Sequence, residues 1–339
     1  MTTETNSKIA LILGATGGIG GAVAENLAKR GWQVRALNRN VAKAQATRPD
    51  FDWQQGDAMM PGDVLAAAQG VDVIVHAVNP PGYKNWGEFV LPMLDNTIAA
   101  AQATGATIVL PGTIYNFGPD AFPILRENSP QNPRTKKGVI RAEMESRLKT
   151  AADKGTPVII VRAGDFFGPG AANNWFSQGL VKAGQPVKSV LYPGKAGLGH
   201  QWAYLPDVAE TMAQLIERGS VLPNFAVYHM NGVWDADGRQ MTGAIEKAAG
   251  RKLRIWGFPW FALPLLAPFV TFFRELGEMR YLWAEPLKMD NSKLVAELGE
   301  EPHTPIDDAV RTTLVACNCI DIEKPAARAL RAERLMFLA

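Results

Sequence analysis

Glycines near the start of the chain are spaced for binding a phosphate group. Gly14, Gly17 and Gly20 directly follow the apolar run 9–13, and an Ala-rich helical pattern continues to Gly31. This order predicts a buried strand, a glycine turn and a helix N-terminus, whose free N–H groups and positive dipole end attract phosphate oxygens. Missing side chains let a pyrophosphate approach the backbone. The segment therefore predicts a dinucleotide site; the alternative is a glycine turn without a ligand, which the flanking strand and helix disfavour.

The end of the second predicted strand indicates which dinucleotide fits. About 20 residues past such glycines, NAD sites carry an Asp or Glu that accepts from the ribose 2′-OH. This chain has Asn38 and Arg39 there, and Arg39 can pair with a 2′-phosphate in a charge-assisted hydrogen bond. Arg35, inside the strand, is a second candidate. The sequence favours NADP(H) and leaves NAD(H) open, with a solvated surface arginine as the alternative.

The glycine spacing also carries a family resemblance. G-x-x-G-x-x-G resembles the extended branch of the short-chain dehydrogenase/reductase superfamily, which includes nucleotide-sugar epimerases, dehydratases and reductases. The resemblance implies a Rossmann domain and a smaller C-terminal substrate lobe. It also implies that Asp57 bonds the adenine amino group and that the loop after the fourth strand passes the cofactor ribose. The expected cofactor contacts are Gly14, Thr16, Gly17, Gly18, Ile19, Gly20, Asn38, Arg39, Asp57, Ala58, Ala77, Val78, Asn79 and Arg141.

The catalytic positions depart from that family. Resembling proteins carry Ser or Thr after the fifth strand, and about two dozen residues later a Tyr-x-x-x-Lys pair that relays a proton and binds the nicotinamide ribose. Thr113 takes the hydroxyl position. Anchoring on the Arg-Ala-Glu sequence that begins at Arg141 puts Lys137 where the Tyr belongs and Arg141 where the Lys belongs. No tyrosine lies between Tyr115 and Tyr192.

These replacements leave the proton donor open. Arg141 can bind ribose hydroxyls but cannot act as an acid or base, because it stays charged. Lys137 is a candidate donor if burial favours its neutral form, and Tyr115 and Tyr83 are candidates from other loops. The alternative is an exposed basic helix start in which Lys137 and Arg141 are solvated. The expected catalytic residues are Thr113, Tyr115, Lys137 and Arg141.

Two later segments resemble the substrate side of the same family. Asp165 stands where those proteins have an Asn that contacts substrate, and a carboxylate would repel a diphosphate. His200 lies about where sugar-nucleotide enzymes carry an Arg that holds the diphosphate. Phe166 and Trp202 complete the expected substrate contacts; the many aromatic residues here suit an apolar or aromatic substrate, although core packing explains some of them. Asp207 is expected to cap the following helix.

Strand and helix patterns alternate through the first half of the chain, which predicts an α/β fold with a doubly wound parallel sheet and a C-terminal α/β lobe. The expected strands are 9–13, 32–37, 51–54, 71–77, 107–110 and 158–162, and the expected helices are 88–104, 138–152, 207–218, 243–249 and 304–315. The run 225–230 is expected to rejoin the sheet. We expect a Rossmann domain over 1–165, joined by a segment near 200–232, and a substrate lobe over 166–339 that ends in a surface helix, 324–339.

Composition narrows the class of protein. A chain of 339 residues, 47% hydrophobic and with a net charge of +2, is globular and gives no case for a nucleic-acid partner. The polar start, 1–8, lacks a signal-peptide layout. Cys317 and Cys319 are the only cysteines and stand too close for a disulfide, so the cytoplasm is expected; no histidine has metal-ligand spacing around them. The apolar run 255–273 contains prolines and is expected to be buried or to line a pocket, rather than to span a membrane.

Three functions remain open. The first is an NAD(P)-dependent epimerase- or reductase-like oxidoreductase that transfers hydride at a carbonyl or alcohol carbon of a small molecule. The second is a sensor or assembly protein that binds NADP(H) without turnover, because the Tyr and Lys are missing. The third is a peripheral membrane or quinone-linked protein, suggested by 255–273. Family resemblance also implies a homodimer through the helices 88–104 and 138–152.

Overall fold

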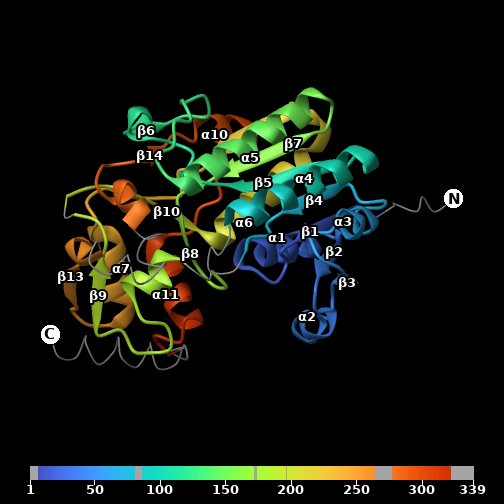
Figure 1. The fold of residues 1–339 in the computed structure, drawn as a ribbon. Helices are drawn as coiled ribbons and strands as arrows, with labels where there is room; N and C mark the ends of the chain where they lie inside the picture. The colour runs from blue at the N-terminus through green and yellow to red at the C-terminus, as the bar shows by residue number, and fades with distance from the viewer. Residues whose placement is uncertain (1–6, 81–85, 172–173, 196, 264–276, 322–339) are drawn as a thin grey trace.

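Seven parallel strands form the central sheet (Figure 1) of a computed structural model that describes residues 7–80, 86–171, 174–195, 197–263 and 277–321. Their order is β3-β2-β1-β4-β5-β7-β11, with β1 Ile9–Leu13, β2 Gln33–Asn38, β3 Asp52–Gln55, β4 Val73–His76, β5 Thr107–Gly112, β7 Val158–Arg162 and β11 Phe225–His229. This is the doubly wound Rossmann arrangement with one added strand. From β1 the first strands are added in one direction along the sheet, and from β4 onward they are added in the other, so the strand order reverses between β1 and β4. The prediction of an α/β fold with a parallel sheet is confirmed, and each predicted strand bound holds within two residues.

The strands form where short aliphatic runs are covered on both faces. Leu11 and Ile12 of β1, Ile74 of β4 and Ile108 of β5 have no exposed surface. Near-continuous apolar runs of this kind are typical of parallel strands buried between two layers of helices. Because these apolar runs are short and nearly continuous, the strands could be predicted from the sequence.

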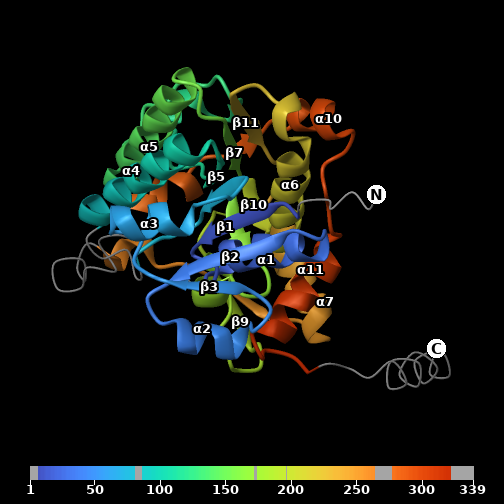
Figure 2. The ribbon, with the colours of Figure 1, turned by 90° about the vertical axis from the view of Figure 1, so that its right-hand side faces the viewer.

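Helices cover both faces of the sheet. They are α1 Gly18–Lys29, α2 Val41–Thr47, α3 Pro61–Ala67, α4 Trp86–Thr104, α5 Lys136–Asp153, α6 Leu205–Arg218, α7 Arg239–Ala249, α10 Ser292–Leu298 and α11 Ile306–Ala316. Figure 2 shows α3, α4 and α5 along one face and α1 and α6 along the other. Helices are present at the five ranges 88–104, 138–152, 207–218, 243–249 and 304–315, with starts displaced by two to four residues; α5 starts two residues early because Thr135 caps it ahead of the apolar positions that periodicity detects.

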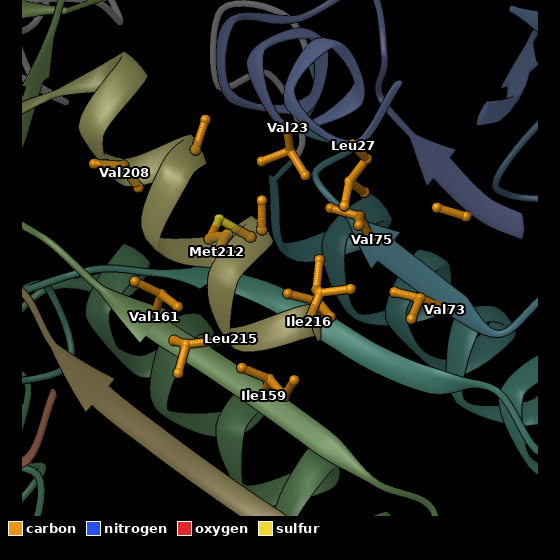
Figure 3. Packing of buried hydrophobic residues seen from close by; sticks show 14 of the residues in the cluster. Val23, Leu27, Val73, Val75, Ile159, Val161, Val208, Met212, Leu215 and Ile216 are labelled. Carbon is orange, nitrogen blue, oxygen red and sulfur yellow. The ribbon is translucent and has the colours of Figure 1, made fainter. Parts of the chain in front are cut away.

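The core between α1, α6 and the sheet fixes the glycine loop in place (Figure 3). The apolar side chains of α6 recur at spacings of three and four residues, which gathers them on one face. The residues that meet in this core include Val23, Leu27, Val73, Val75, Ile159, Val161, Val208, Met212, Leu215 and Ile216. Because α1 is packed along its length, its N-terminus is held at the carboxyl end of β1.

A smaller lobe follows β7 along the chain. Its strands are β8 Asp165–Phe167, β10 His200–Tyr204 and β12 Val233–Asp235 in one sheet, and β9 Ser189–Tyr192 with β13 Arg254–Gly257 in another; β6 Ile124–Leu125 pairs with β14 Lys288–Met289. Helices α7 and α11 pack against each other in this lobe (Figure 1). The segment expected to rejoin the Rossmann sheet divides: β11 pairs in parallel with β7, whereas β10 stays in the three-stranded sheet.

Two expectations about these elements are corrected. Helix α6 begins at Leu205, so Asp207 does not cap it; the Asp207 carboxylate instead accepts hydrogen bonds from the backbone N–H and hydroxyl of Thr304, both at 2.7 Å. In the apolar run 255–273, Ile255, Trp256 and Phe261 are 45%, 49% and 82% exposed, so the expectation of burial is wrong for these three.

Parts of two predicted segments lie outside the described residues. These are 264–273 of the apolar run and the terminal helix 324–339. Among the helices that are described, none has the length and apolar character needed to cross a bilayer.

Candidate cofactor and substrate site

A cavity of about 2170 Å³ opens where β1 and β4 end, at the switch point of the sheet. Its walls come from the loops after β1, β2, β4 and β5, from the start of α5 and from the smaller lobe. Sites for one small ligand commonly measure about 300–1,000 Å³. This cavity therefore has room for a dinucleotide and a second molecule.

The glycine loop has no space for side chains at its closest points. Gly14 has a φ of +96°, and a Cβ there would lie 2.6 Å from the carbonyl oxygen of Ala77. A Cβ on Gly20 would lie 2.3 Å from the Gly14 carbonyl oxygen, so Gly20 lets α1 pack on the loop and does not itself line the cavity. The remaining predicted loop contacts do line it: Gly14, Thr16, Gly17, Gly18 and Ile19. The N-terminus of α1 thus lies at the cavity, where its unpaired N–H groups are available to an anion.

The four residues expected around the adenosine line one end of the cavity together. They are Asn38, Arg39, Asp57 and Ala58. The Arg39 side chain is 72% exposed, and its Nη1 lies 3.9 Å from the Asp57 carboxylate. The Asn38 side-chain oxygen accepts a hydrogen bond from the Asn40 backbone N–H at 2.8 Å and so shapes the turn. The guanidinium of Arg39 remains accessible to an incoming phosphate.

Other basic residues at this end differ from the sequence expectation. The Arg35 guanidinium bonds the Asp52 carboxylate at 3.1 Å and the Ala67 carbonyl at 2.9 Å, so the expectation that Arg35 assists with a phosphate is wrong. Lys43 and Arg48, from α2 and its end, line the cavity and were not predicted. The sequence shows both as basic residues within ten positions of Asn38, but their spacing alone does not reveal that they face the cavity.

The loop after β4 contributes Ala77, Val78 and Asn79 to the cavity wall, as expected. His76 precedes it, lines the same wall and is buried. Its Nδ1 lies 2.8 Å from the Thr97 hydroxyl, which itself donates to the Met93 carbonyl, so Nδ1 carries the proton and Nε2 is an acceptor. Nε2 is buried with no hydrogen-bond partner among the described residues. Burial, and less strongly the charge of Arg141, lowers the pKa of His76 to about 3, so this histidine is neutral.

The expected catalytic residues Thr113, Tyr115, Lys137 and Arg141 all line the cavity. The start of α5 packs tightly on the loop after β5, because a Cβ on Gly138 would lie 2.3 Å from the Tyr115 carbonyl oxygen. The Thr135 side chain caps α5 by accepting from the Gly138 N–H at 3.0 Å. This packing buries Lys137, which is only 6% exposed, so the alternative of a solvated Lys137 does not hold.

The other members of this group sit on either side of Lys137 in sequence. Thr113 accepts a hydrogen bond from the Tyr115 backbone N–H at 3.3 Å. Arg141 is half-buried, with its guanidinium carbon 5.2 Å from the centre of the Trp86 ring. Tyr83, the remaining candidate donor, lies outside the described residues.

A buried ion pair that sequence reasoning missed anchors α5 to the sheet. Glu145 of α5 accepts two hydrogen bonds from the Arg162 guanidinium, and both side chains are almost fully buried. Gln131 donates to the same carboxylate at 2.9 Å, and Arg162 Nη1 lies 2.9 Å from His229 Nε2. Burial, followed by the charge of Arg162, lowers the pKa of His229 to about 3. The pair holds the helix that carries Lys137 and Arg141 in a fixed position.

The predicted substrate residues divide into two groups. Asp165 and Phe166 line the cavity, whereas His200 and Trp202 are buried behind its wall. His200 Nε2 lies 2.8 Å from an Asp165 carboxylate oxygen, and the His200 ring stacks on Trp283 with centroids 3.6 Å apart. Trp202 is fully buried in the lobe core. Other cavity residues from the lobe, among them Trp175, Phe258 and Met279, were not among the predicted substrate contacts, although the many aromatic residues of this region indicated the kind of surface.

The arrangement joins two kinds of chemistry in one cavity. Helix α1 and the glycine loop offer N–H donors for a pyrophosphate, and Arg39 a cation beside them. Thr113, Lys137 and Arg141 supply a hydroxyl, an amine and a guanidinium near the middle of the cavity. Among the described residues no group of His, Cys, Asp and Glu has an arrangement that could hold a metal ion.

Solved structures share the whole fold. UDP-glucose 4-epimerase from Bifidobacterium longum, in complex with NAD+ and UDP, has a TM-score of 0.70 at 15% identity and covers 92% of this chain and 100% of its own. UDP-N-acetylglucosamine 4-epimerase from Bacillus cereus has a TM-score of 0.69 at 17% identity, covering 94% and 99%. UDP-glucose 4-epimerase from Thermus thermophilus, in complex with NAD, has a TM-score of 0.68 at 20% identity, covering 91% and 98%. At these identities the similarity is one of fold.

Sequence comparisons add the family. A search of the curated proteins finds no match. The model of the NAD dependent epimerase/dehydratase family matches residues 10–230, which include the glycine loop, the expected catalytic residues and β11. Because this match extends over more than half of the chain, the protein belongs to the NAD dependent epimerase/dehydratase family.

Proposed function

We propose that this protein is a nicotinamide-dinucleotide oxidoreductase that acts at a carbonyl or alcohol carbon, with NADP(H) preferred over NAD(H). The observation that carries the proposal is the glycine loop. A Cβ at Gly14 or Gly20 would overlap backbone, so these glycines let the loop pack closely on the Ala77 backbone and on α1, and this packing holds the N-terminus of α1 at the cavity. The unpartnered Nε2 of His76 adds a buried acceptor at the same wall. These features fit a dinucleotide that crosses from the adenosine end toward Thr113.

Positive charge at the end of β2 supports the preference for NADP(H). Asn38 replaces the acid that would accept from a ribose 2′-OH, and its side chain is engaged in the local turn. Arg39 presents an accessible guanidinium there, and Lys43 adds a second cation to the same end of the cavity. A 2′-phosphate gains charge-assisted hydrogen bonds from such groups, whereas a ribose hydroxyl gains little.

The roles of the chain's own side chains follow from their chemistry. The bound nicotinamide supplies or accepts the hydride at the substrate carbon. Thr113 donates to the carbonyl oxygen, and Lys137 delivers or receives the proton at that oxygen, which is general acid–base catalysis. Arg141 stays charged and so holds the ribose hydroxyls rather than moving a proton. The buried pair of Glu145 and Arg162 positions the helix on which both basic residues stand.

Replacing Lys137 tests this assignment. We expect Lys137→Met to lower kcat with NADPH and a panel of ketones by about 10²–10⁴-fold, because the acid is lost. NADPH affinity should change much less. The matched control is Lys136→Met, which removes the same charge from an exposed position one residue away and should leave kcat unchanged. Tight NADPH binding by the wild type without turnover of any panel member would instead favour the non-catalytic sensor or assembly function.

We also propose a homodimer through α4 and α5, on the family resemblance. The two helices pack side by side along one face of the sheet and carry partly exposed Leu91, Ile98 and Ile140, with Val139 56% exposed. Light scattering should give twice the chain mass. A monomer at all concentrations would contradict this proposal and leave the proposed activity standing.

A further inference from the structure

Charge is distributed unevenly along the cavity. The cations Lys29, Arg39, Lys43 and Arg48 line its adenosine end and outnumber the two carboxylates there, Glu25 and Asp57, while Lys137 and Arg141 line its middle. Among the described lining residues contributed by the smaller lobe, the only charged side chain is Asp165. The lobe end of the cavity therefore offers a negative charge and, within the described part of the chain, no cation to balance a phosphate.

The Asp165 carboxylate is held in place. Asp165 lies on β8 and His200 on the neighbouring strand β10, where the parallel register pairs Asp165 with Trp202. One carboxylate oxygen lies 2.8 Å from His200 Nε2, and Asp165 and His200 are 7% and 3% exposed. His200 in turn stacks on Trp283, with ring planes only 9° apart. A carboxylate fixed by a histidine behind it is a directed acceptor toward the cavity it lines.

The surrounding wall is mainly apolar and aromatic, with Asn174, Gln178 and Thr312 as polar members. Trp175 lines the cavity with Phe258, their ring centroids 5.9 Å apart in an edge-to-face arrangement. Trp175 also contacts Trp283 edge-to-face at 5.3 Å, so the aromatic wall and the support for His200 are continuous. Met279 and Phe166 complete a surface that favours a flat, hydrophobic ring over a hydrated sugar phosphate.

From these observations we propose that the substrate is an uncharged ring compound without phosphate, whose hydroxyl group donates a hydrogen bond to Asp165. The ring packs on Trp175 and Phe258, and the carbonyl or alcohol carbon that reacts lies toward Thr113. A nucleoside diphosphate would place anionic oxygens against a fixed carboxylate in an apolar pocket, where repulsion is poorly screened. This substrate class rests on the proposed function for its reactivity, but its binding can be measured separately.

Calorimetry on the full chain saturated with NADP+ tests the proposal. The probes are acetophenone, its three hydroxy isomers, UDP and UDP-glucose. The isomers differ from acetophenone only by the hydroxyl donor. We expect at least one hydroxyacetophenone to bind about 10-fold tighter than acetophenone, the ratio typical of a hydrogen bond to a charged acceptor. UDP and UDP-glucose should bind more weakly than that isomer.

Variants locate the effect at Asp165. Asp165→Asn keeps an oxygen for His200 and removes the charge, so it should shrink the preference for the hydroxyl and strengthen UDP binding. Asp153→Asn makes the same change on the exposed end of α5 and should behave as the wild type. The wild-type comparison of the ketones with UDP does not depend on whether Asp165→Asn folds.

The outcomes are distinct. Equal binding of acetophenone and all its hydroxy isomers, absence of ketone binding, or tighter binding of UDP-glucose would each overturn the substrate class. If NADP+ itself fails to bind in the preceding titration, the proposed function fails instead. If NADP+ binds and UDP-glucose is preferred, the oxidoreductase stands and only the ring substrate is lost.

Discussion

Arg39 is the residue on which the proposed preference for NADP(H) depends. It is largely exposed, and the carboxylate of its ion-pair partner, Asp57, lies 3.9 Å away, so it can reorient toward a 2′-phosphate at small cost. We expect Arg39→Asp to weaken NADPH binding by about 10–100-fold, the loss of one or two charge-assisted hydrogen bonds. NADH binding should stay the same or improve, because the new acid can accept from a 2′-OH.

Fluorescence titrations with both cofactors measure this preference. The matched control is Arg239→Asp, which makes the same charge reversal on a side chain that is 82% exposed and does not line the cavity. Equal losses for NADPH and NADH in Arg39→Asp would contradict the assignment. They would mean that Arg39 supports the fold of the loop rather than the phosphate.

At this scale the sequence predicted well wherever a motif fixed a residue to a strand end. The four expected catalytic residues, and every expected cofactor residue except Gly20, line one cavity, because most lie at or just after the ends of strands of one parallel sheet and the start of α5 packs on the loop after β5. The prediction for Arg35 was wrong because its ion-pair partner Asp52 lies on the neighbouring strand β3, and no local sequence pattern reveals that pairing. His200 and Trp202 do not line the cavity, because His200 stacks on Trp283 and Trp202 is buried in the lobe core, and no local sequence pattern reveals these contacts.

Helix α5 links local structure to the proposed chemistry. It carries Lys137, Arg141 and Glu145, and Thr135 caps its first turn. We expect Thr135→Ala to lower the free energy of unfolding by about 1 kcal/mol, because the backbone N–H of Gly138 in the first turn of α5 loses its acceptor. It should also lower kcat, because Lys137 lies in the turn that frays. Thr150→Ala, an exposed position in the same helix, should change neither quantity appreciably.

Denaturant unfolding and steady-state kinetics measure the two effects together. A loss of stability without any change in kcat would indicate that the first turn of α5 does not position Lys137. The element itself was predictable from its pattern, within two residues at its start. The Glu145–Arg162 pair that anchors it was not, because the partners come from different elements and meet only in the folded core.

For the whole molecule, two buried neutral histidines make the free energy of unfolding depend on pH. His76 and His229 both have a pKa of about 3 in the folded chain against 6.5 for the free side chain. Between these values the unfolded chain binds more protons than the folded chain, so stability is complete above pH 6.5 and is lost as pH falls toward 3. Each histidine should remove about 2 kcal/mol of unfolding free energy between pH 6.5 and about pH 5.

Urea unfolding across this pH range measures the slope. His76→Asn keeps a hydrogen-bond donor for Thr97 and removes the titrating imidazole. The loss of unfolding free energy at acid pH should therefore fall by about half. His303→Gln, at an exposed position, should leave the slope as in the wild type. A slope unchanged by His76→Asn would show that this histidine does not control acid stability.

The cavity is a property of the whole chain. Its sheet side was predicted from consecutive strands and loops, since the Rossmann order places them side by side. Its lobe side was predicted at Asp165 and Phe166 only, because Trp175, Phe258 and Met279 come from separate parts of the chain and meet only through the three-dimensional packing of the lobe. Aromatic content indicated the kind of surface there but not which residues form it.

Transfer of an isotope label tests most directly whether hydride transfer takes place in this cavity. NADPH carrying deuterium at the reactive C4 position is incubated with a panel of cyclic and aromatic ketones, and the alcohol products are examined by mass spectrometry. We expect the wild type to place deuterium on the former carbonyl carbon and Lys137→Met to do so at a rate lower by about 10²–10⁴-fold. NADPH that binds tightly yet transfers no deuterium to any ketone would contradict this expectation.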